Sequence, residues 1–194
     1  MRLYFIRHGQ SEGNISDRHN AWAQVSLTEK GKQDAAMAGR ILKNVHFDKV
    51  YTSDLIRTIQ TQKIALPEAE SEALFLLREV NVGNLLGRRV GDCAAEYGEE
   101  YYANRFATNF APYGGESYED LSQRIRQFLT MMENSPYETV AVFGHGTYMT
   151  VLLDVVTGIH HNKRTLSCSN GNVSAFSFRD GMWHVDAWNC TEFT

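Results

Sequence analysis

Two histidines that each lie beside glycine are the residues of this chain best suited to do chemistry. They occur in Arg7-His8-Gly9 and in Gly144-His145-Gly146, and each tripeptide follows an apolar run typical of a buried strand. A glycine beside a histidine lets the backbone come close to a ligand and adopt a positive φ. The pattern predicts that both histidines lie where a small molecule binds.

Two arginines accompany these histidines. Arg7 precedes His8, and Arg57 falls in the first turn of a helix that we expect to follow a strand. The positive charge of an arginine is unfavourable next to the N-terminus of a helix, which is the positive end of the helix dipole. The arginine and that end of the dipole can, however, bind an anion together. Taken singly, each residue also fits an ordinary role, as an exposed ion-pair partner or a core histidine. Together they predict a pocket for a dianion, most simply a phosphoryl group.

The elements that must position these residues alternate between strand and helix. Strand patterns cover residues 2–6, 47–52, 73–77 and 139–143, and helical patterns cover residues 28–42, 53–66, 116–132 and 147–156. A terminal hairpin is predicted over residues 173–189, with its turn at Asp180-Gly181. This alternation predicts an α/β fold, a three-layer α/β/α sandwich with a mostly parallel central sheet. In such sheets ligands bind beyond the carboxyl ends of the strands, where His8 and His145 fall.

The periodic pattern weakens between Gly83 and Gly115, where glycines alternate with aromatic residues. We expect short helices and loops here, and we assign about residues 84–115 to a cap over the site within a single domain of residues 1–194. The aromatic rings are expected mainly to pack this cap. Two roles are open to three arginines of this segment. They either bind a second anionic group of the substrate or are exposed charges on the surface of a helix. The three are Arg88, Arg89 and Arg105.

Composition excludes several classes of function. The 194 residues carry a formal charge of −4 at pH 7 with both signs mixed, so no nucleic-acid partner is expected. No apolar run approaches the roughly 18 to 20 residues of a membrane helix. The cysteines, Cys93, Cys168 and Cys190, form no CxxC pair, and the first apolar stretch is too short for a signal peptide, so we expect a cytoplasmic protein. His160-His161 lacks a carboxylate at ligand spacing, so no metal site is predicted. The oligomeric state is left open.

A series of ordered motifs over residues 2–156 resembles those of the histidine phosphatase superfamily, also called phosphoglycerate-mutase-like. The segment from Arg7 to Asn14 is similar to the opening RHG motif of that family, which is followed by a short polar stretch and Asn. The other motifs follow in the family's order, and they are Leu27-Thr28 with Gly31, residues 51–61, Leu77-Arg78-Glu79 with Gly83 and Gly87, residues 114–117 and residues 142–146.

The resemblance implies a role for each of the key residues. His8 would be the nucleophile that forms a phosphohistidine, with its other ring nitrogen donating to a backbone carbonyl. Glu79 would protonate the leaving group and then accept a proton from water. The phosphoryl oxygens would be bound by four side chains, those of Arg7, Asn14, Arg57 and His145. No cofactor and no metal ion are implied.

Two positions depart from the family pattern. Leu86 stands where the glycine-rich element after the acid often has an acidic residue, and Asp34 stands in place of the usual glutamine of the second motif. Neither position takes part in phosphoryl chemistry. The departures therefore bear on how a substrate fits.

The function expected from these observations is that of a phosphomonoesterase acting on a small phosphorylated metabolite. Cofactor-dependent phosphoglycerate mutases of the family resemble longer chains whose insertions close over the site, and a chain of 194 residues fits the shorter phosphatase branch. A mutase remains the first alternative. A phosphate-binding regulatory module with little turnover is the second, and the presence of Glu79 counts against it. A dehydrogenase is disfavoured because no GxGxxG follows the first strand.

Overall fold

The central sheet has six strands in the order β3-β2-β4-β1-β5-β6. The computed structural model describes residues 1–160, 166 and 168–192. Its strands are β1 (Arg2–Arg7), β2 (Lys49–Ser53), β3 (Glu72–Leu74), β4 (Thr139–Gly144), β5 (Val173–Arg179) and β6 (Met182–Cys190). Strands β3, β2, β4 and β1 are mutually parallel, whereas β5 and β6 each run antiparallel to the strand before them in the sheet. The prediction of a mostly parallel sheet is confirmed.

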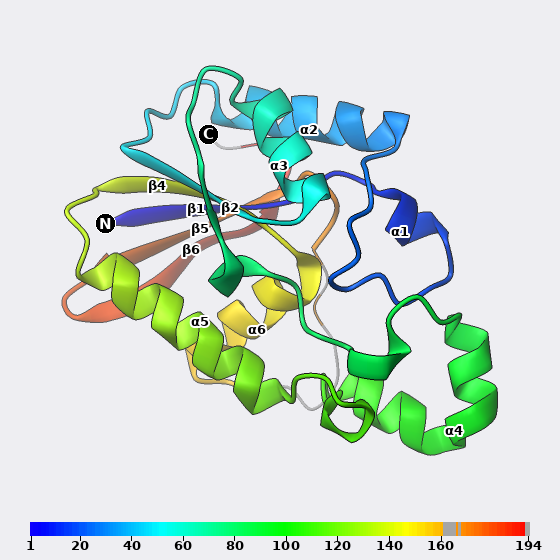
Figure 1. Cartoon of the computed structure of the whole chain (residues 1–194). Coiled ribbons are helices and arrows are strands. Elements are labelled where there is room, and N and C mark those ends of the chain that lie inside the picture. Colours follow the sequence, from blue (N-terminus) through cyan, green and yellow to red (C-terminus); the bar gives the residue numbers. More distant parts are fainter. Residues whose placement is uncertain (161–165, 167, 193–194) are drawn as a thin grey trace.

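Helices cover both faces of this sheet. They are α1 (Glu12–Ile15), α2 (Glu29–Leu42), α3 (Ile56–Ala65), α4 (Val90–Phe106), α5 (Tyr118–Glu133) and α6 (Gly146–Thr157). Three short 3₁₀ turns, η1 (Phe75–Leu77), η2 (Gly83–Leu85) and η3 (Ala111–Tyr113), lie in the connections. Figure 1 shows α2 and α3 on one face and α5 and α6 on the other, with α1 and α4 beyond the end of the sheet. The predicted three-layer sandwich is confirmed.

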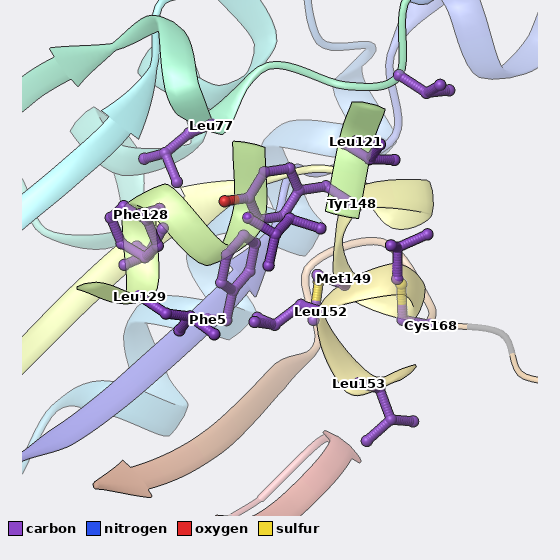
Figure 2. Close-up of a cluster of buried hydrophobic side chains, with 14 of the residues drawn as sticks. Phe5, Leu77, Leu121, Phe128, Leu129, Tyr148, Met149, Leu152, Leu153 and Cys168 are labelled. Carbon is purple, nitrogen blue, oxygen red and sulfur yellow. The ribbon is translucent and has the colours of Figure 1, made fainter. Parts of the chain in front are cut away.

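Strand β1 supplies apolar side chains to both layers, because successive side chains of a strand point to opposite faces. Tyr4 and Ile6 belong to the cluster that α2 and α3 cover. Leu3 and Phe5 belong to the larger cluster on the side of α5 and α6. Figure 2 shows Phe5 beside Tyr148, and their rings stack with centroids 5.5 Å apart. Each such fully buried side chain stabilises the fold by roughly 1.5 to 3 kcal/mol.

Local signals fix the ends of several elements. Thr28 is the N-cap of α2, and its side chain accepts a hydrogen bond from the backbone N–H of Gly31, as predicted. Ser117 and Asp120 form a capping box at the start of α5. The residues of the predicted turn, Asp180 and Gly181, both have positive φ, 52° and 73°, as a tight hairpin requires.

Two predicted boundaries are wrong. The strand predicted over residues 73–77 ends at Leu74, and residues 75–77 form the 3₁₀ turn η1 instead. This turn leaves the side chain of Phe75 outside the core. Its ring makes an edge contact with the ring of Trp22, and the two ring centroids are 5.2 Å apart. The helix cap predicted at Ser53-Asp54 lies instead at Leu55, and α3 begins at Ile56, because Ser53 still pairs within the sheet.

The connection between Glu79 and the second histidine is mostly helical. Between residues 84 and 115 the structure has η2, α4 and η3, and α4 is interrupted at Gly98, whose φ of 61° and ψ of −142° lie outside the helical region. The expectation of short helices and loops therefore describes this segment well. Within the described parts of the chain, no helix combines the length and the apolar character that crossing a membrane requires.

Candidate active site

The adjacent strands β1 and β4 bring the two histidines together. Arg7 pairs in register with Gly144, so the residues that follow them leave the sheet side by side. The backbone N–H of His8 continues the ladder by donating to the carbonyl oxygen of Gly144 over 3.0 Å. The rings of His8 and His145 lie 5.3 Å apart between centroids, and both side chains are buried.

The ring of His8 is held in one tautomer. Its Nδ1 lies 2.7 Å from the carbonyl oxygen of Gly9, an acceptor only, so Nδ1 carries the proton and donates. Its Nε2 then has an unshared electron pair, to which Nε of Arg57 donates over 3.3 Å. Burial, assisted by the positive charges of Arg57 and Arg7, holds the pKa of His8 well below its usual value. His8 is therefore neutral near pH 7.

Arg57 comes from the first turn of α3 and joins both histidines to a neighbouring loop. Its Nη2 donates to Nδ1 of His145 over 3.1 Å and to the carbonyl oxygen of Ala21 over 2.7 Å. Its Nη1 donates to the carbonyl oxygen of Ala23 over 3.0 Å. Because these partners are neutral, the guanidinium charge is left available to an anion.

The charge of Arg57 survives its burial. The pKa of Arg57 is lowered to about 10, mainly by burial; the charge of Glu79 opposes this lowering and the charge of Arg7 adds to it. A guanidinium with that pKa is still protonated at pH 7.

Two buried nitrogens at the centre of the site have no hydrogen-bond partner in the part of the chain that the structure describes. They are Nε of Arg7 and Nε2 of His145. Since Nδ1 of His145 accepts from Arg57, Nε2 of the neutral ring carries the proton. An unpartnered buried donor costs about 1–3 kcal/mol. Burial, helped by the charge of Arg57, holds the pKa of His145 well below its usual value, so this ring is also neutral.

Arg7 is anchored through Nη1. Its Nη1 donates to the carbonyl oxygen of Cys168. Gly146 packs closely against it, because a Cβ at that position would lie only 3.1 Å from Nε of Arg7. The two unpartnered donors thus belong to side chains that are otherwise fixed.

Glu79 lies at the N-terminus of α6, which begins directly after His145. Its Oε2 accepts from the backbone N–H of Thr147 over 3.0 Å. Its Oε1 accepts from those of Tyr148 and Val80, over 3.1 and 2.9 Å. The side chain is half-buried. Backbone donors on two segments therefore fix the carboxyl group beside the second histidine.

The main chain at Glu79 is held by residues that sequence reasoning missed. Trp22 Nε1 and Arg124 Nη2 both donate to its carbonyl oxygen, over 2.6 and 3.2 Å. Arg124 also donates to the carbonyl oxygen of Arg78 over 2.6 Å and forms an ion pair with Glu116 at 2.8 Å. Arg124 follows Glu116 by eight residues, but no sequence pattern marks a side chain that binds backbone carbonyls.

Asn14 lies at the exposed rim of the site. Its Oδ1 accepts from the backbone N–H of Ser11 over 2.9 Å and from Nδ2 of Asn170 over 3.3 Å. Asn170, which the sequence analysis missed, also donates to the carbonyl oxygen of His8 over 2.8 Å. The amide oxygen of Asn14 is thus occupied, which turns its NH₂ group toward other acceptors.

A small cavity opens beside Glu79. Its volume is about 150 Å³, and its wall includes Arg18, His19, Glu79, Arg105, Phe110 and Thr147. Nε2 of His19 lies 2.6 Å from the hydroxyl oxygen of Tyr101, in the interior of α4. The cavity therefore connects Glu79 with residues of the segment 84–115.

No metal ligand set accompanies this arrangement among the residues that the structure describes, since no group of three or more His, Cys, Asp and Glu side chains converges there. The ring of His160 stacks on that of Tyr118 with centroids 3.9 Å apart. The other histidine of the predicted loop pair, His161, lies outside the described residues.

Comparison with known proteins identifies the family. A sequence model of the histidine phosphatase superfamily (branch 1) matches residues 3–191. The 2,3-bisphosphoglycerate-dependent phosphoglycerate mutase of Cytophaga hutchinsonii is 34% identical over 162 residues, which cover 78% of this chain and 75% of the relative. A mutase of the same description from Streptococcus thermophilus is 38% identical over 107 residues, which cover 52% of this chain and 46% of the relative.

Solved structures share the whole fold. An Escherichia coli K-12 protein assigned as an alpha-ribazole-5'-P phosphatase has a TM-score of 0.87 and 25% identity, and the match covers 99% of this chain and 98% of that one. A mycobacterial glucosyl-3-phosphoglycerate phosphatase, solved with VO3, has a TM-score of 0.86 and 23% identity over 97% of this chain and 98% of its own. With the family match over residues 3–191, these findings place the protein among histidine phosphatases. The chain therefore belongs to branch 1 of the histidine phosphatase superfamily and is an enzyme of that superfamily.

Proposed function

We propose that the protein is a phosphomonoesterase that hydrolyses a small phosphate ester through a phosphohistidine on His8. The observation that carries the proposal is the unprotonated Nε2 of His8, which lies among donors that have no partner among the described residues. These donors, Nε of Arg7 and Nε2–H of His145, suit phosphoryl oxygens. A neutral nucleophile surrounded by unused donors is what transfer of an anionic group requires.

In the first step, Nε2 of His8 attacks phosphorus, the N–P bond forms and the P–O bond to the leaving group breaks. The long contact from Nε of Arg57 to this nitrogen gives way, and the guanidinium donates to a phosphoryl oxygen instead. The two guanidinium groups of Arg7 and Arg57 neutralise the dianion, and His145 donates a neutral hydrogen bond. Asn14 contributes its NH₂ group from the rim. The proposal uses no metal ion.

Glu79 supplies the proton for the leaving group. Its Oε2 accepts one backbone hydrogen bond where Oε1 accepts two, so we place the proton on Oε2. After the alkoxide has taken this proton, the carboxylate accepts a proton from the attacking water. Water then breaks the N–P bond, and phosphate and neutral His8 are regenerated. A positioned acid of this kind contributes about 10² to 10⁴ in rate.

The segment between Glu79 and His145 favours hydrolysis over the mutase reaction, in which the phosphoryl group is returned from His8 to the bound intermediate. This segment contains α4, η3 and α5, and α5 is part of the sandwich rather than of a lid. The E. coli structure that matches along nearly the whole chain is described as a phosphatase. We further propose that about residues 84–115 act as a substrate-selecting cap within one domain.

A mutase is the second candidate, because the curated relatives at 34% and 38% identity are 2,3-bisphosphoglycerate-dependent phosphoglycerate mutases. It is distinguished by its products, since a mutase interconverts 2- and 3-phosphoglycerate and releases little phosphate. A binding module without turnover is opposed by the fixed position of Glu79. The three free thiols, those of Cys93, Cys168 and Cys190, fit our proposal of a cytoplasmic location.

The experiment is a phosphate-release screen of purified protein in the presence of EDTA, over a panel of phosphate esters, with His8→Ala beside the wild type. We expect the wild type to release phosphate from at least one ester and His8→Ala to release none. A parallel assay follows interconversion of 2- and 3-phosphoglycerate with catalytic 2,3-bisphosphoglycerate. Interconversion without phosphate release would establish the mutase instead, and release that survives His8→Ala would refute the proposed nucleophile.

A further inference from the structure

The peptide group that fixes the tautomer of His8 is itself bound from its other side. The carbonyl oxygen of Gly9 lies 2.7 Å from Nδ1 of His8 and accepts its proton in a hydrogen bond. The backbone N–H of Gln10 belongs to the same peptide group, and it donates to Oδ2 of Asp34 over 3.0 Å. In a planar trans peptide the C=O and the N–H point in opposite directions. One peptide group therefore lies between the carboxylate of Asp34 and the ring of His8.

Helix α2 places Asp34 for this contact. The side chain of Asp34 is only 12% exposed, and its Oδ1 forms an ion pair at 2.8 Å with Nζ of Lys30, one helical turn earlier. The side chain of Lys30 is 64% exposed, so water screens this pair and the charge of Asp34 still acts on Gln10. From the sequence this position is expected to bear on how a substrate fits, whereas its carboxylate faces the main chain that follows His8.

The neighbouring peptide groups are fixed by other residues. The backbone N–H of Gly9 donates to Oγ1 of Thr61 on α3 over 3.0 Å. The carbonyl oxygen of Gln10 accepts from the backbone N–H of Thr28, the N-cap of α2, over 3.0 Å. Asp34 thus binds the one peptide group of this segment whose carbonyl accepts from the nucleophile.

The reaction of His8 gives this contact a role in the chemistry. When Nε2 bonds to phosphorus while Nδ1 keeps its proton, both ring nitrogens are substituted and the ring becomes positively charged. A carbonyl oxygen stabilises that charge through the Nδ1–H hydrogen bond, and a carboxylate bound to the N–H of the same peptide group polarises the carbonyl further. When water breaks the N–P bond, the electron pair returns to Nε2 and the ring is neutral again.

The other charges that act on His8 oppose a positive ring. Burial and the charges of Arg57 and Arg7 lower the pKa of His8, whereas its hydrogen bond to Gly9 acts in the opposite direction. The contact on the Nδ1 side therefore favours the charged form of the ring in a site that otherwise disfavours it. A negative charge behind that contact strengthens it.

We propose that Asp34 is a positioning residue for His8, which acts through the Gly9–Gln10 peptide group to hold Nδ1–H and to stabilise the positive charge that forms on the ring during phosphoryl transfer. The inference rests on the proposed function, because that function makes His8 the nucleophile. The glutamine that is usual at this position in the family pattern offers an oxygen acceptor without a charge. The stabilising charge is what Asp34 adds.

The kinetic test separates the charge from the contact. Asp34→Asn keeps the shape and an oxygen acceptor, whereas Asp34→Ala removes both the acceptor and the charge. Because loss of a partner that orients a functional histidine typically costs about 10- to 100-fold, kcat/KM on the preferred ester should fall by this factor in Asp34→Ala. Asp34→Asn should lie between Asp34→Ala and the wild type. A wild-type kcat/KM in Asp34→Ala would overturn the proposal, and one in Asp34→Asn would overturn the role of the charge.

Asp48 provides the matched control. Its Oδ2 also accepts from backbone N–H groups, those of Glu138 and Thr139 over 2.9 and 2.8 Å, but it directly precedes β2 and so lies at the end of the sheet away from the histidines. Asp48→Asn and Asp48→Ala should have the kcat/KM of the wild type. A loss in the Asp48 variants equal to that in the Asp34 variants would show a general effect on the fold and overturn the proposal.

Nuclear magnetic resonance separates failure of this inference from failure of the proposed function, because it requires no turnover. Protein labelled with ¹⁵N in histidine is used, and the Nδ1–H proton of His8 is assigned by its absence from His8→Ala. A weaker hydrogen bond moves this resonance upfield, so we expect an upfield shift in Asp34→Asn, a larger one in Asp34→Ala and none in Asp48→Asn. If the wild type releases no phosphate but these shifts are found, the proposed hydrolysis fails and the contact through the peptide group stands. An unaltered resonance in both Asp34 variants would contradict the inference whatever the activity.

Discussion

Arg57 and His145 are joined by a buried hydrogen bond in which Nη2 of the arginine donates to Nδ1 of the histidine over 3.1 Å. The bond determines which nitrogen of His145 carries the proton, because a ring nitrogen that accepts has none. It therefore makes Nε2 of His145 a donor toward the centre of the site. One arginine thus orients both histidines, since its Nε contacts His8 as well.

Arg57→Lys is predicted to keep the positive charge and lose the orientation, because an ammonium cannot contact His8, His145 and two carbonyl oxygens at once. Loss of a donor of this type costs about 10² to 10³ in kcat. Steady-state kinetics on the preferred ester measure this. Arg40→Lys, an exchange at an exposed position of α2, is the control. An Arg57→Lys enzyme with the kcat of the wild type would show that the fork geometry is unimportant.

Glu79→Gln is predicted to impair esters according to their leaving group. Glutamine preserves the shape and removes the transferable proton, so kcat for an alkyl phosphate should fall by about 10² to 10⁴. The loss should be much smaller for p-nitrophenyl phosphate, whose phenolate leaves without protonation. The ratio of the two losses is the measurement. Equal losses for both esters would mean that Glu79 does not act as the acid.

Arg124→Met is predicted to destabilise the protein by about 3–5 kcal/mol, because it leaves the carboxylate of Glu116 and several carbonyl oxygens without their buried partner. The matched control is Arg126→Met, two residues along α5, whose exposed pair with Glu119 should cost about 0–1 kcal/mol. Urea unfolding compares the two. If the two variants lose the same stability, the buried ion pair does not hold the segment that carries Glu79.

The free energy of unfolding is predicted to fall as the pH is lowered from 6.5 to 4. The folded protein holds the pKa values of His8, His145 and His19 below the unfolded value, that of His19 at about 4, so in this range the unfolded chain binds more protons than the folded one. Each such histidine contributes up to about 1.4 kcal/mol per pH unit. Urea unfolding at pH 7.5, 6.0 and 5.0 measures the slope.

His19→Gln isolates one part of this pH dependence. Glutamine does not titrate and can still form a hydrogen bond with Tyr101, so the slope below pH 6.5 should be shallower than in the wild type. The exchange His46→Gln, at a histidine outside this set, should leave the slope unaltered. A wild-type slope in His19→Gln would contradict the assigned contribution of His19.

The approach of the two histidines to each other could be predicted from the sequence because it depends on strand ends. His8 and His145 each follow a continuous apolar strand, and parallel neighbours in a sheet bring their carboxyl ends together. Arg57 was recognisable from its place in a helix that follows a strand, although the first residue of that helix is later than predicted. The family motifs then selected Glu79 and Asn14.

What could not be predicted are the contacts between side chains and distant main chain. Arg124, Trp22 and Asn170 act by donating to backbone carbonyls, and any residue type offers such a carbonyl, so the sequence contains no partner to search for. The turn at residues 75–77 was missed because a short apolar run suits a strand and a 3₁₀ turn alike.

The most direct measurement of the central claim is capture of the phosphorylated enzyme. Wild-type protein is mixed with an excess of its preferred ester, quenched in base within one turnover, digested and analysed by mass spectrometry. The account predicts one phosphoryl group per chain, attached to His8, stable in base and labile in acid, and absent from His8→Ala. A phosphoryl group on any other residue, or turnover with no phosphorylated enzyme at any quench time, would contradict it.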